Sequence, residues 1–168
     1  MRIFFLLFFI ALLPACQTMQ GAQQAAFTPR QVAVLEQQGF EQAGDDWQFG
    51  MADRLLFDTD QSALIPTQKS VIGGIASALV KVGIHGARIE GHTDSVGKAA
   101  YNDALSTRRA QAVADALLLG GMTPQALRIA GMGARIPIES NQSASGRREN
   151  RRVVIIVSPS DAEPIARP

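Results

Sequence analysis

Three side chains that could bind a charged ligand occur close together in the middle of the chain. Asp94 follows a predicted strand, and Gly97 allows the chain to turn into a predicted helix. On that helix Asn102, Leu105 and Arg109 occupy positions i, i+3 and i+7 and therefore share one face. Free backbone N–H groups at the start of the helix favour an anion. Such a pocket suits a zwitterion, with the carboxylate on its ammonium and the guanidinium on its carboxylate.

Spacing alone leaves an alternative open for this pair. Asp94 and Arg109 could form an ordinary ion pair on a solvated helix, a common and weak arrangement. No other pattern indicates an enzyme or a metal site. His92 and His85 are the only histidines and have no third ligand nearby, and the loop at Asp58 lacks the glycine and glutamate of a calcium loop. We therefore expect no catalytic residue, no metal and no cofactor.

Length and composition exclude further classes. The chain has 168 residues, 16 basic and 15 acidic side chains, and one cysteine. A net charge of +1 argues against a strongly basic nucleic-acid binder, so nucleic acid is not an expected partner. A single cysteine excludes a disulfide framework and a cysteine-built zinc site. The charges are unevenly placed, because residues 17–60 are acidic and residues 128–152 are basic. These two regions could attract each other or two different partners.

The N-terminus has the pattern of an export signal. Residues 3–15 form an apolar run that is shorter than the roughly 20 residues needed to cross a bilayer but fits a secretory signal. The run ends at Leu13-Pro14-Ala15-Cys16, which resembles the lipobox of bacterial lipoproteins. That resemblance implies a signal peptide over 1–15, a diacylated Cys16 and, with Gln17 next, sorting to the outer membrane. An ordinary signal peptide with an incidental cysteine is the alternative.

The next segments are expected to lie ahead of the main domain. Residues 16–28 are rich in Gln, Ala and Gly and predict a flexible tether. Thr28 and Pro29 then fit an N-cap and the first position of a short helix ending near Gln38. Residues 40–49 have apolar ends around a turn and predict a hairpin. Together these elements define a separate segment over 29–50.

The main domain is predicted over residues 51–158, with a loose tail over 159–168. Leu55-Leu56-Phe57 indicates a buried strand. Periodicity and turn residues predict helices over 66–82 and 99–118 and strands over 88–93, 128–133 and 153–157. The continuous β-branched run at 153–157 is typical of a central strand. The expected fold is an α/β (α+β) sandwich, a mixed sheet with helices on one face.

The residues around the candidate pocket resemble a known family. The pattern TD-x-x-G-x-x-x-x-N-x-x-L-S-x-x-R-A, with the later Asn150-Arg151-Arg152-Val153, is similar to the OmpA-like peptidoglycan-binding domain. The resemblance covers roughly Leu55 to Val157 and implies a βαβαβ-β arrangement. It also implies that Asp94 and Arg109 hold the ammonium and the carboxylate of meso-diaminopimelate in the peptidoglycan stem peptide.

Further contacts are implied by the same resemblance. Asn102 and Arg151 match family positions at the site, and Gly97 and Leu105 belong to the shared motif. Asp60 matches a loop position that often carries Asn in the family. A backbone contact there would tolerate the change, whereas a side-chain contact with a bound carboxylate would be weakened.

The front of the chain carries a second resemblance. Residues 16–18, 31–41 and 47–51 are similar to the lipoprotein of an envelope-stress signalling trio, which captures a periplasmic repressor and so frees an inner-membrane diguanylate cyclase. This implies a partner surface that includes Leu35, Phe40 and Trp47, although these apolar side chains could equally cap the core of the domain. The alternative function is a structural anchor between outer membrane and peptidoglycan with no signalling partner. Homodimer formation is left open.

Overall fold

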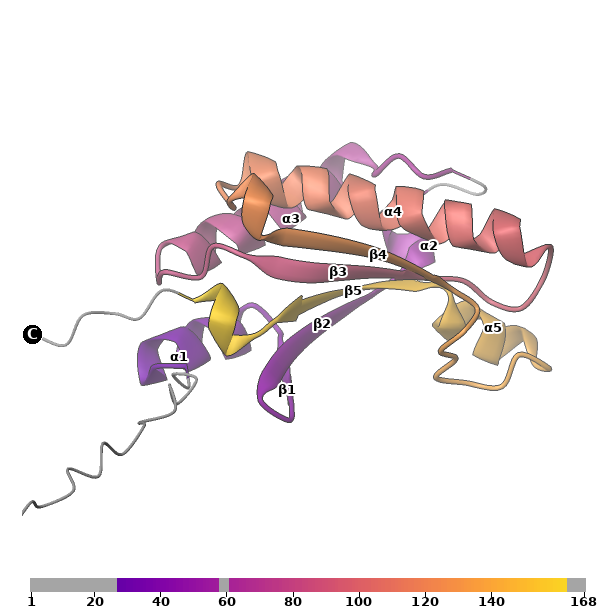
Figure 1. Cartoon of the computed structure of the whole chain (residues 1–168), viewed down its shortest axis with the longest axis horizontal. Coiled ribbons are helices and arrows are strands. Elements are labelled where there is room, and N and C mark those ends of the chain that lie inside the picture. The colour runs from indigo at the N-terminus through magenta and orange to yellow at the C-terminus, as the bar shows by residue number, and fades with distance from the viewer. Residues whose placement is uncertain (1–26, 58–60, 163–168) are drawn as a thin grey trace, which may run out of the picture.

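Five strands form one mixed sheet in the order β1-β2-β5-β3-β4 (Figure 1). The computed structural model describes residues 27–57 and 61–162. The strands are β1 (Glu41–Ala43), β2 (Asp46–Ala52), β3 (Ala87–His92), β4 (Leu127–Gly133) and β5 (Arg152–Val157). Only β3 and β4 run parallel, and the other neighbours are antiparallel. All residues of β5 from Val153 to Val157 are buried, which confirms the predicted central strand.

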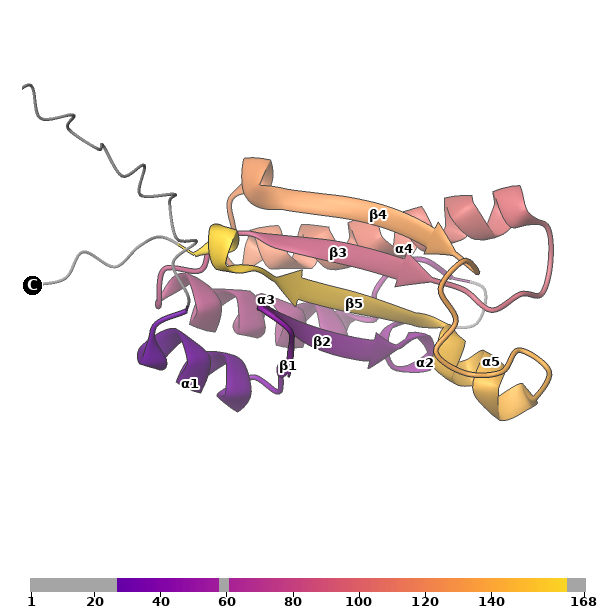
Figure 2. The same ribbon diagram turned by 60° about the horizontal axis from the view of Figure 1, so that its bottom comes forward.

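Two long helices cover one face of this sheet (Figures 1 and 2). They are α3 (Pro66–Val80) and α4 (Ala99–Leu119), and α4 packs directly on β3 and β4. The contact is close because Gly91 of β3 has no side chain: a Cβ there would lie 2.0 Å from the Ser106 carbonyl oxygen. The expected mixed sheet with helices on one face is therefore confirmed.

The front segment is part of the same body. Thr28 caps α1 (Pro29–Gln37) with a reciprocal capping box to Gln31, as the Thr-Pro pair predicted. The hairpin is also present, but its second strand β2 pairs with β5 from Trp47 to Ala52. The boundary expected after residue 50 thus falls inside a strand of the main sheet.

One expectation for element type was wrong. Leu55-Leu56-Phe57 was expected to form a strand, but the chain forms the single-turn helix α2 (Asp53–Leu56), in which Leu55 is 53% exposed. The physical reason is that β2 already occupies the place beside β5. A helix that was not expected, α5 (Ala144–Asn150), begins at Ser143, whose hydroxyl accepts the Gly146 N–H.

The end of the described chain is packed against the domain. Two 3-10 turns occur, at Pro124–Ala126 and Pro159–Asp161. Asp161 is 6% exposed and forms an ion pair of 2.9 Å with Arg128, so residues 159–162 are not the loose tail that the sequence indicated. Residues 163–168 lie outside the described part.

Candidate functional site

The candidate site lies at the end of the sheet where β2 and β3 finish and β5 begins (Figure 2). Asp94 follows β3, and Arg151 immediately precedes β5. Arg109 reaches the site from α4, and Asp53, the first residue of α2, comes from the end of β2. Four segments of the chain thus bring two carboxylates and two guanidiniums together.

Asp94 has a partner for each of its carboxylate oxygens. Its Oδ2 lies 2.5 Å from Arg151 Nη1, and its Oδ1 accepts the Val96 N–H at 2.9 Å. The residue is 8% exposed. The carboxylate is therefore fixed both by an ion pair and by the turn that follows it.

Asn102 holds that turn in place. Its Nδ2 donates to the backbone oxygens of Asp94, at 3.3 Å, and Val96, at 3.0 Å. Gly97 has a φ of +94°, a left-handed conformation that favours glycine. The predicted amide and glycine therefore shape the loop that presents Asp94, which explains why these residue types occur there.

Arg109 is 5% exposed and is held from three sides. Its Nη2 lies 3.0 Å from Asp53 Oδ2, and its Nε donates to the Gln61 carbonyl oxygen at 3.2 Å. The guanidinium also lies over the ring of Phe57, 5.2 Å from its centroid. Both Asp94 and Arg109 are buried in separate ion pairs, which differs from the alternative of a solvated surface pair between them.

Burial and the neighbouring charges of the cluster together shift the pKa of Asp53. Burial raises the pKa of the Asp53 carboxyl, while Arg109 and Arg151 oppose this rise and Asp94 adds to it. Sequence reasoning did not find Asp53. An acidic residue directly after the apolar positions of a strand was the only signal, and it could not identify a partner on α4.

The remaining predicted residues are placed less centrally or lie outside the described chain. Leu105 is half-buried on α4, and the Arg151 side chain is 36% exposed. Asp60 and Cys16 are among the residues whose structure is not described.

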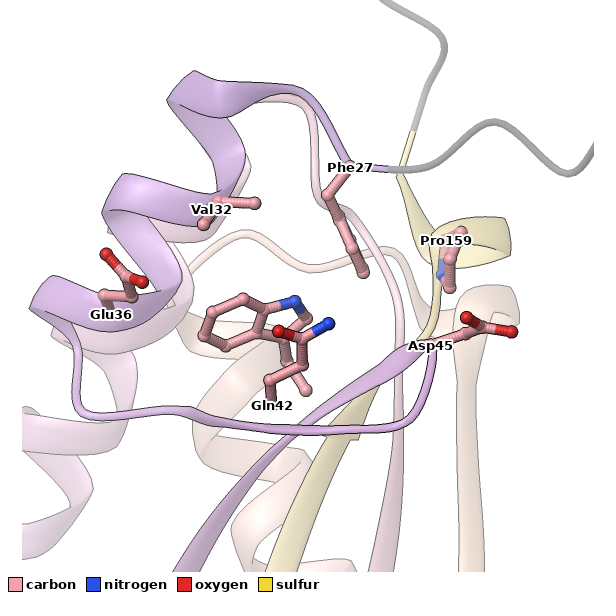
Figure 3. A pocket seen from close by; sticks show the side chains of 7 residues that line it. Phe27, Val32, Glu36, Gln42, Asp45 and Pro159 are labelled. Carbon is pink, nitrogen blue, oxygen red and sulfur yellow. The ribbon is translucent and has the colours of Figure 1, made fainter.

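A hollow lies at the end of β2 opposite to the candidate site, between α1 and the hairpin (Figure 3). Its volume is about 450 Å³, and Trp47 forms part of its wall. The remaining lining residues are Phe27, Val32, Glu36, Gln42, Asp45 and Pro159. The hollow therefore combines apolar side chains with two carboxylates, and the carboxylates agree with the acidic front seen in the sequence.

The three apolar residues expected at a partner surface are buried. Leu35, Phe40 and Trp47 are 0%, 3% and 6% exposed and belong to the hydrophobic core. The alternative in which they cap the core describes their position in this structure. Of the three, Trp47 lines the hollow of Figure 3.

His92 lies on the sheet face opposite the two long helices and is 2% exposed. Neither ring nitrogen has a hydrogen-bond partner. Burial, with a smaller contribution from Arg152, lowers the pKa of His92 to about 4. Within residues 27–57 and 61–162 no group of three or more His, Cys, Asp or Glu could hold a metal ion. No helix in these ranges is both long and apolar enough for a bilayer.

The fold agrees with matches to known proteins. A model of the OmpA family matches residues 56–151, and the chain belongs to this family. The chain is also 40% identical over 154 residues to the lipoprotein YfiB of Escherichia coli, which covers 91% of this chain and 94% of that relative. Identity to the outer-membrane lipoprotein YfiB of Pseudomonas aeruginosa is 41% over 145 residues, with 86% and 85% covered.

A solved structure shows the same arrangement. The cell wall anchor of the T6SS from Pseudomonas aeruginosa matches with a TM-score of 0.64 and 30% identity, covering 80% of this chain and 99% of that chain. The likeness to the YfiB proteins extends beyond the family match at residues 56–151 and includes most of the front segment.

Proposed function

We propose that the chain binds the peptidoglycan stem peptide through meso-diaminopimelate, without catalysing a reaction. Asp94 takes the ammonium group and Arg109 the carboxylate, because the fold brings these two side chains to one end of the sheet. This arrangement is the observation that carries the proposal. Opposite charges held on separate elements match a zwitterion better than they match a ligand of one sign.

The other predicted residues support this pair. Asn102 and Gly97 shape the loop that presents Asp94. Arg151 orients the Asp94 carboxylate, and Leu105 offers an apolar surface beside them. Asp60 contributes backbone groups in this proposal.

Pelleting with purified peptidoglycan tests the wall-binding site. Asp94→Ala or Arg109→Ala should abolish pelleting, whereas the exposed Arg148→Ala on α5 should pellet like the wild type. A circular dichroism spectrum for each variant separates loss of binding from loss of fold. Unchanged pelleting of both site variants would exclude the assignment.

The chain further acts as an envelope-stress sensor in this proposal. Lipid on Cys16 anchors it to the outer membrane with the domain in the periplasm, and a YfiR-type repressor is its partner. Capture of the repressor releases an inner-membrane diguanylate cyclase and raises cyclic-di-GMP. Support comes from the 40% and 41% identity to YfiB proteins, which extends over the front segment.

Opening of the front segment would supply the partner surface. Leu35, Phe40 and Trp47 are buried, so the repressor would bind them only after α1 leaves the domain. Residues 17–28 can span at most about 40 Å when extended, which makes engagement of the wall depend on envelope geometry. Engagement of the wall would then favour the open form, and a longer tether would allow the domain to reach the wall more often.

Tether length tests the sensor. Insertion of a flexible segment after residue 20 should raise cyclic-di-GMP in cells, and Phe40→Ala or Trp47→Ala should prevent the repressor from co-purifying. Flat cyclic-di-GMP levels would contradict the mechanism. Binding assays with peptidoglycan alone should remain positive for the tether variant, because its binding site is unchanged.

A structural anchor without a signalling partner is the second candidate. The complete burial of Leu35 and the near-complete burial of Phe40 and Trp47 favour it, since these three residues form no exposed apolar surface in this conformation. The similarity to a cell wall anchor agrees with it. Wall binding with no repressor co-purifying from a cell that produces both proteins would select this candidate.

A further inference from the structure

We propose that Asp53 is an internal competitor for Arg109, holding the guanidinium until the carboxylate of the wall peptide replaces it. This inference rests on the proposed wall-binding function and describes how binding at Arg109 is regulated. The carboxylate Oδ2 of Asp53 lies 3.0 Å from Arg109 Nη2, and the two side chains are 14% and 6% exposed. Asp53 thus makes with Arg109 the kind of contact that a ligand carboxylate would make.

The backbone around Asp53 directs its side chain to this position. Ala52, the last residue of β2, pairs with Arg152, and the Asp53 N–H donates to the Arg151 carbonyl oxygen at 3.0 Å. Asp53 precedes the segment that matches the OmpA family, residues 56–151. The competitor is therefore attached to the front of the chain, through the same strand that begins at the hollow of Figure 3.

Charge balance favours exchange over simultaneous binding. The cluster contains Asp53 and Asp94 with Arg109 and Arg151, so its described charges cancel. A ligand carboxylate placed on Arg109 beside Asp53 would bring two buried anions to one guanidinium, which is costly. Replacement of Asp53 by the ligand keeps one carboxylate on Arg109.

Arg109 can stay oriented during the exchange. Its Nε bonds to the Gln61 backbone and its plane lies over Phe57, contacts that do not involve Asp53. Asp53 in turn is on a helix of four residues whose N-cap has no side-chain hydrogen bond. The competitor side is therefore the less constrained half of the ion pair.

A proton should accompany the exchange. Asp53 is faced by Arg109 from α4, by Arg151 ahead of β5 and by Asp94 from the loop after β3, and burial already raises its pKa. Loss of the Arg109 contact on ligand binding would raise the pKa further, so the complex takes up a proton at Asp53. Affinity for the wall peptide should then rise as pH falls from 7 to 5, while a peptide carboxylate with a pKa near 3.5 stays ionised.

Binding measurements on the full-length chain in detergent test this, with a meso-diaminopimelate-containing muropeptide and intact sacculi as probes. Asp53→Asn should raise affinity roughly tenfold at pH 7 and should flatten the pH dependence. Asp103→Asn is the matched control. Asp103 is on the same helix as Arg109, and it forms an exposed ion pair of 2.6 Å with Arg135 away from the site. That control should match the wild type in both affinity and pH profile.

The outcomes separate this inference from the function on which it rests. Wild-type or weaker binding by a folded Asp53→Asn variant overturns the competitor role. If that variant does not fold, a wild-type affinity that stays flat between pH 7 and 5 overturns it equally. Loss of binding in Arg109→Ala keeps the wall-binding function in either case, whereas full binding by Arg109→Ala removes the function itself.

Discussion

Arg151 Nη1 lies 2.5 Å from Asp94 Oδ2, which joins the residue ahead of β5 to the loop after β3. The contact crosses the end of the sheet at which the proposed wall-binding residues meet. Asp94 is nearly buried, whereas its partner remains 36% exposed. The pair therefore has a structural role that can be measured separately from ligand binding.

Arg151→Ala should lower the free energy of unfolding by about 1–3 kcal/mol, because the buried Asp94 carboxylate loses a charge-assisted hydrogen bond. Urea denaturation measures the change. Arg148→Ala removes an equal charge from an exposed position of α5 and should change stability by less than about 0.5 kcal/mol. Equal losses in the two variants would show that total charge is responsible and the Asp94 contact is not.

Gly91→Ala tests the contact between β3 and α4. The new Cβ would lie 2.0 Å from the Ser106 carbonyl oxygen and 2.8 Å from its carbon, both backbone atoms. The helix would have to move off the strand, so we expect a loss of about 2 kcal/mol or more. Gly74→Ala in α3 meets nothing within 4 Å and should stabilise the protein by up to about 1 kcal/mol. Thermal melts of both variants measure this contrast, and a stable Gly91→Ala variant would contradict the packing.

His92 should make the fold sensitive to acid. Its pKa is about 4 in the folded chain, below its ordinary value of 6.5. Between pH 6.5 and pH 4 the His92 ring is therefore more protonated in the unfolded chain than in the folded chain. The contribution of the neutral ring to the free energy of unfolding is fully present above pH 6.5 and falls as pH drops toward 4. The total loss is about 3 kcal/mol. Glu90 lies 3.4 Å from the ring, but it does not prevent this effect because it is engaged by Arg88.

A urea series between pH 7 and 4 measures that dependence. His92→Gln should reduce the slope, because the glutamine does not titrate, while His85 and the acidic residues are retained in both proteins. The same slope in wild type and variant would assign the acid sensitivity to other groups.

Much of this fold could be predicted because strong periodicity and strong capping agree. The helix at residues 99–119 and the β-branched strand at 152–157 carry their signals locally. Leu55-Leu56-Phe57 was misjudged because three apolar residues fit one helical turn as well as a strand. The choice depends on β2 already pairing with β5, which is a long-range fact that local pattern does not contain.

The candidate site likewise has a part that could be predicted from the sequence and a part that could not. The motif around Asp94, Asn102 and Arg109 is local in sequence and places Asp94 in the loop after β3 and the other two residues on α4. The pairing of Arg109 with Asp53 joins residues from opposite sides of the 61–80 segment and depends on the tertiary fold. Burial of Leu35 was equally beyond the sequence, since an apolar residue on a short helix fits a core or a partner surface.

Gln31 is the polar contact that attaches α1 to the domain, and its removal should loosen that helix alone. Gln31 is 2% exposed; its Nε2 donates to the Val82 carbonyl oxygen at 3.1 Å and its Oε1 accepts the Thr28 N–H. Gln31→Ala breaks the capping box and leaves the Val82 oxygen without this donor, at a cost of about 1–3 kcal/mol. Hydrogen exchange should therefore quicken about tenfold or more in residues 29–38.

Exchange in β3 and β5 is the internal reference, because these strands should open only when the whole domain unfolds. Gln38→Ala at the other end of α1 would be a poor control, since Gln38 is the C-cap of that helix. Arg30→Ala, at an exposed position of the first turn, is the better control and should leave exchange unchanged. In cells, Gln31→Ala should raise cyclic-di-GMP if opening of α1 exposes the partner surface. Faster exchange in α1 with flat cyclic-di-GMP would retain the attachment by Gln31 but reject α1 opening as the signal.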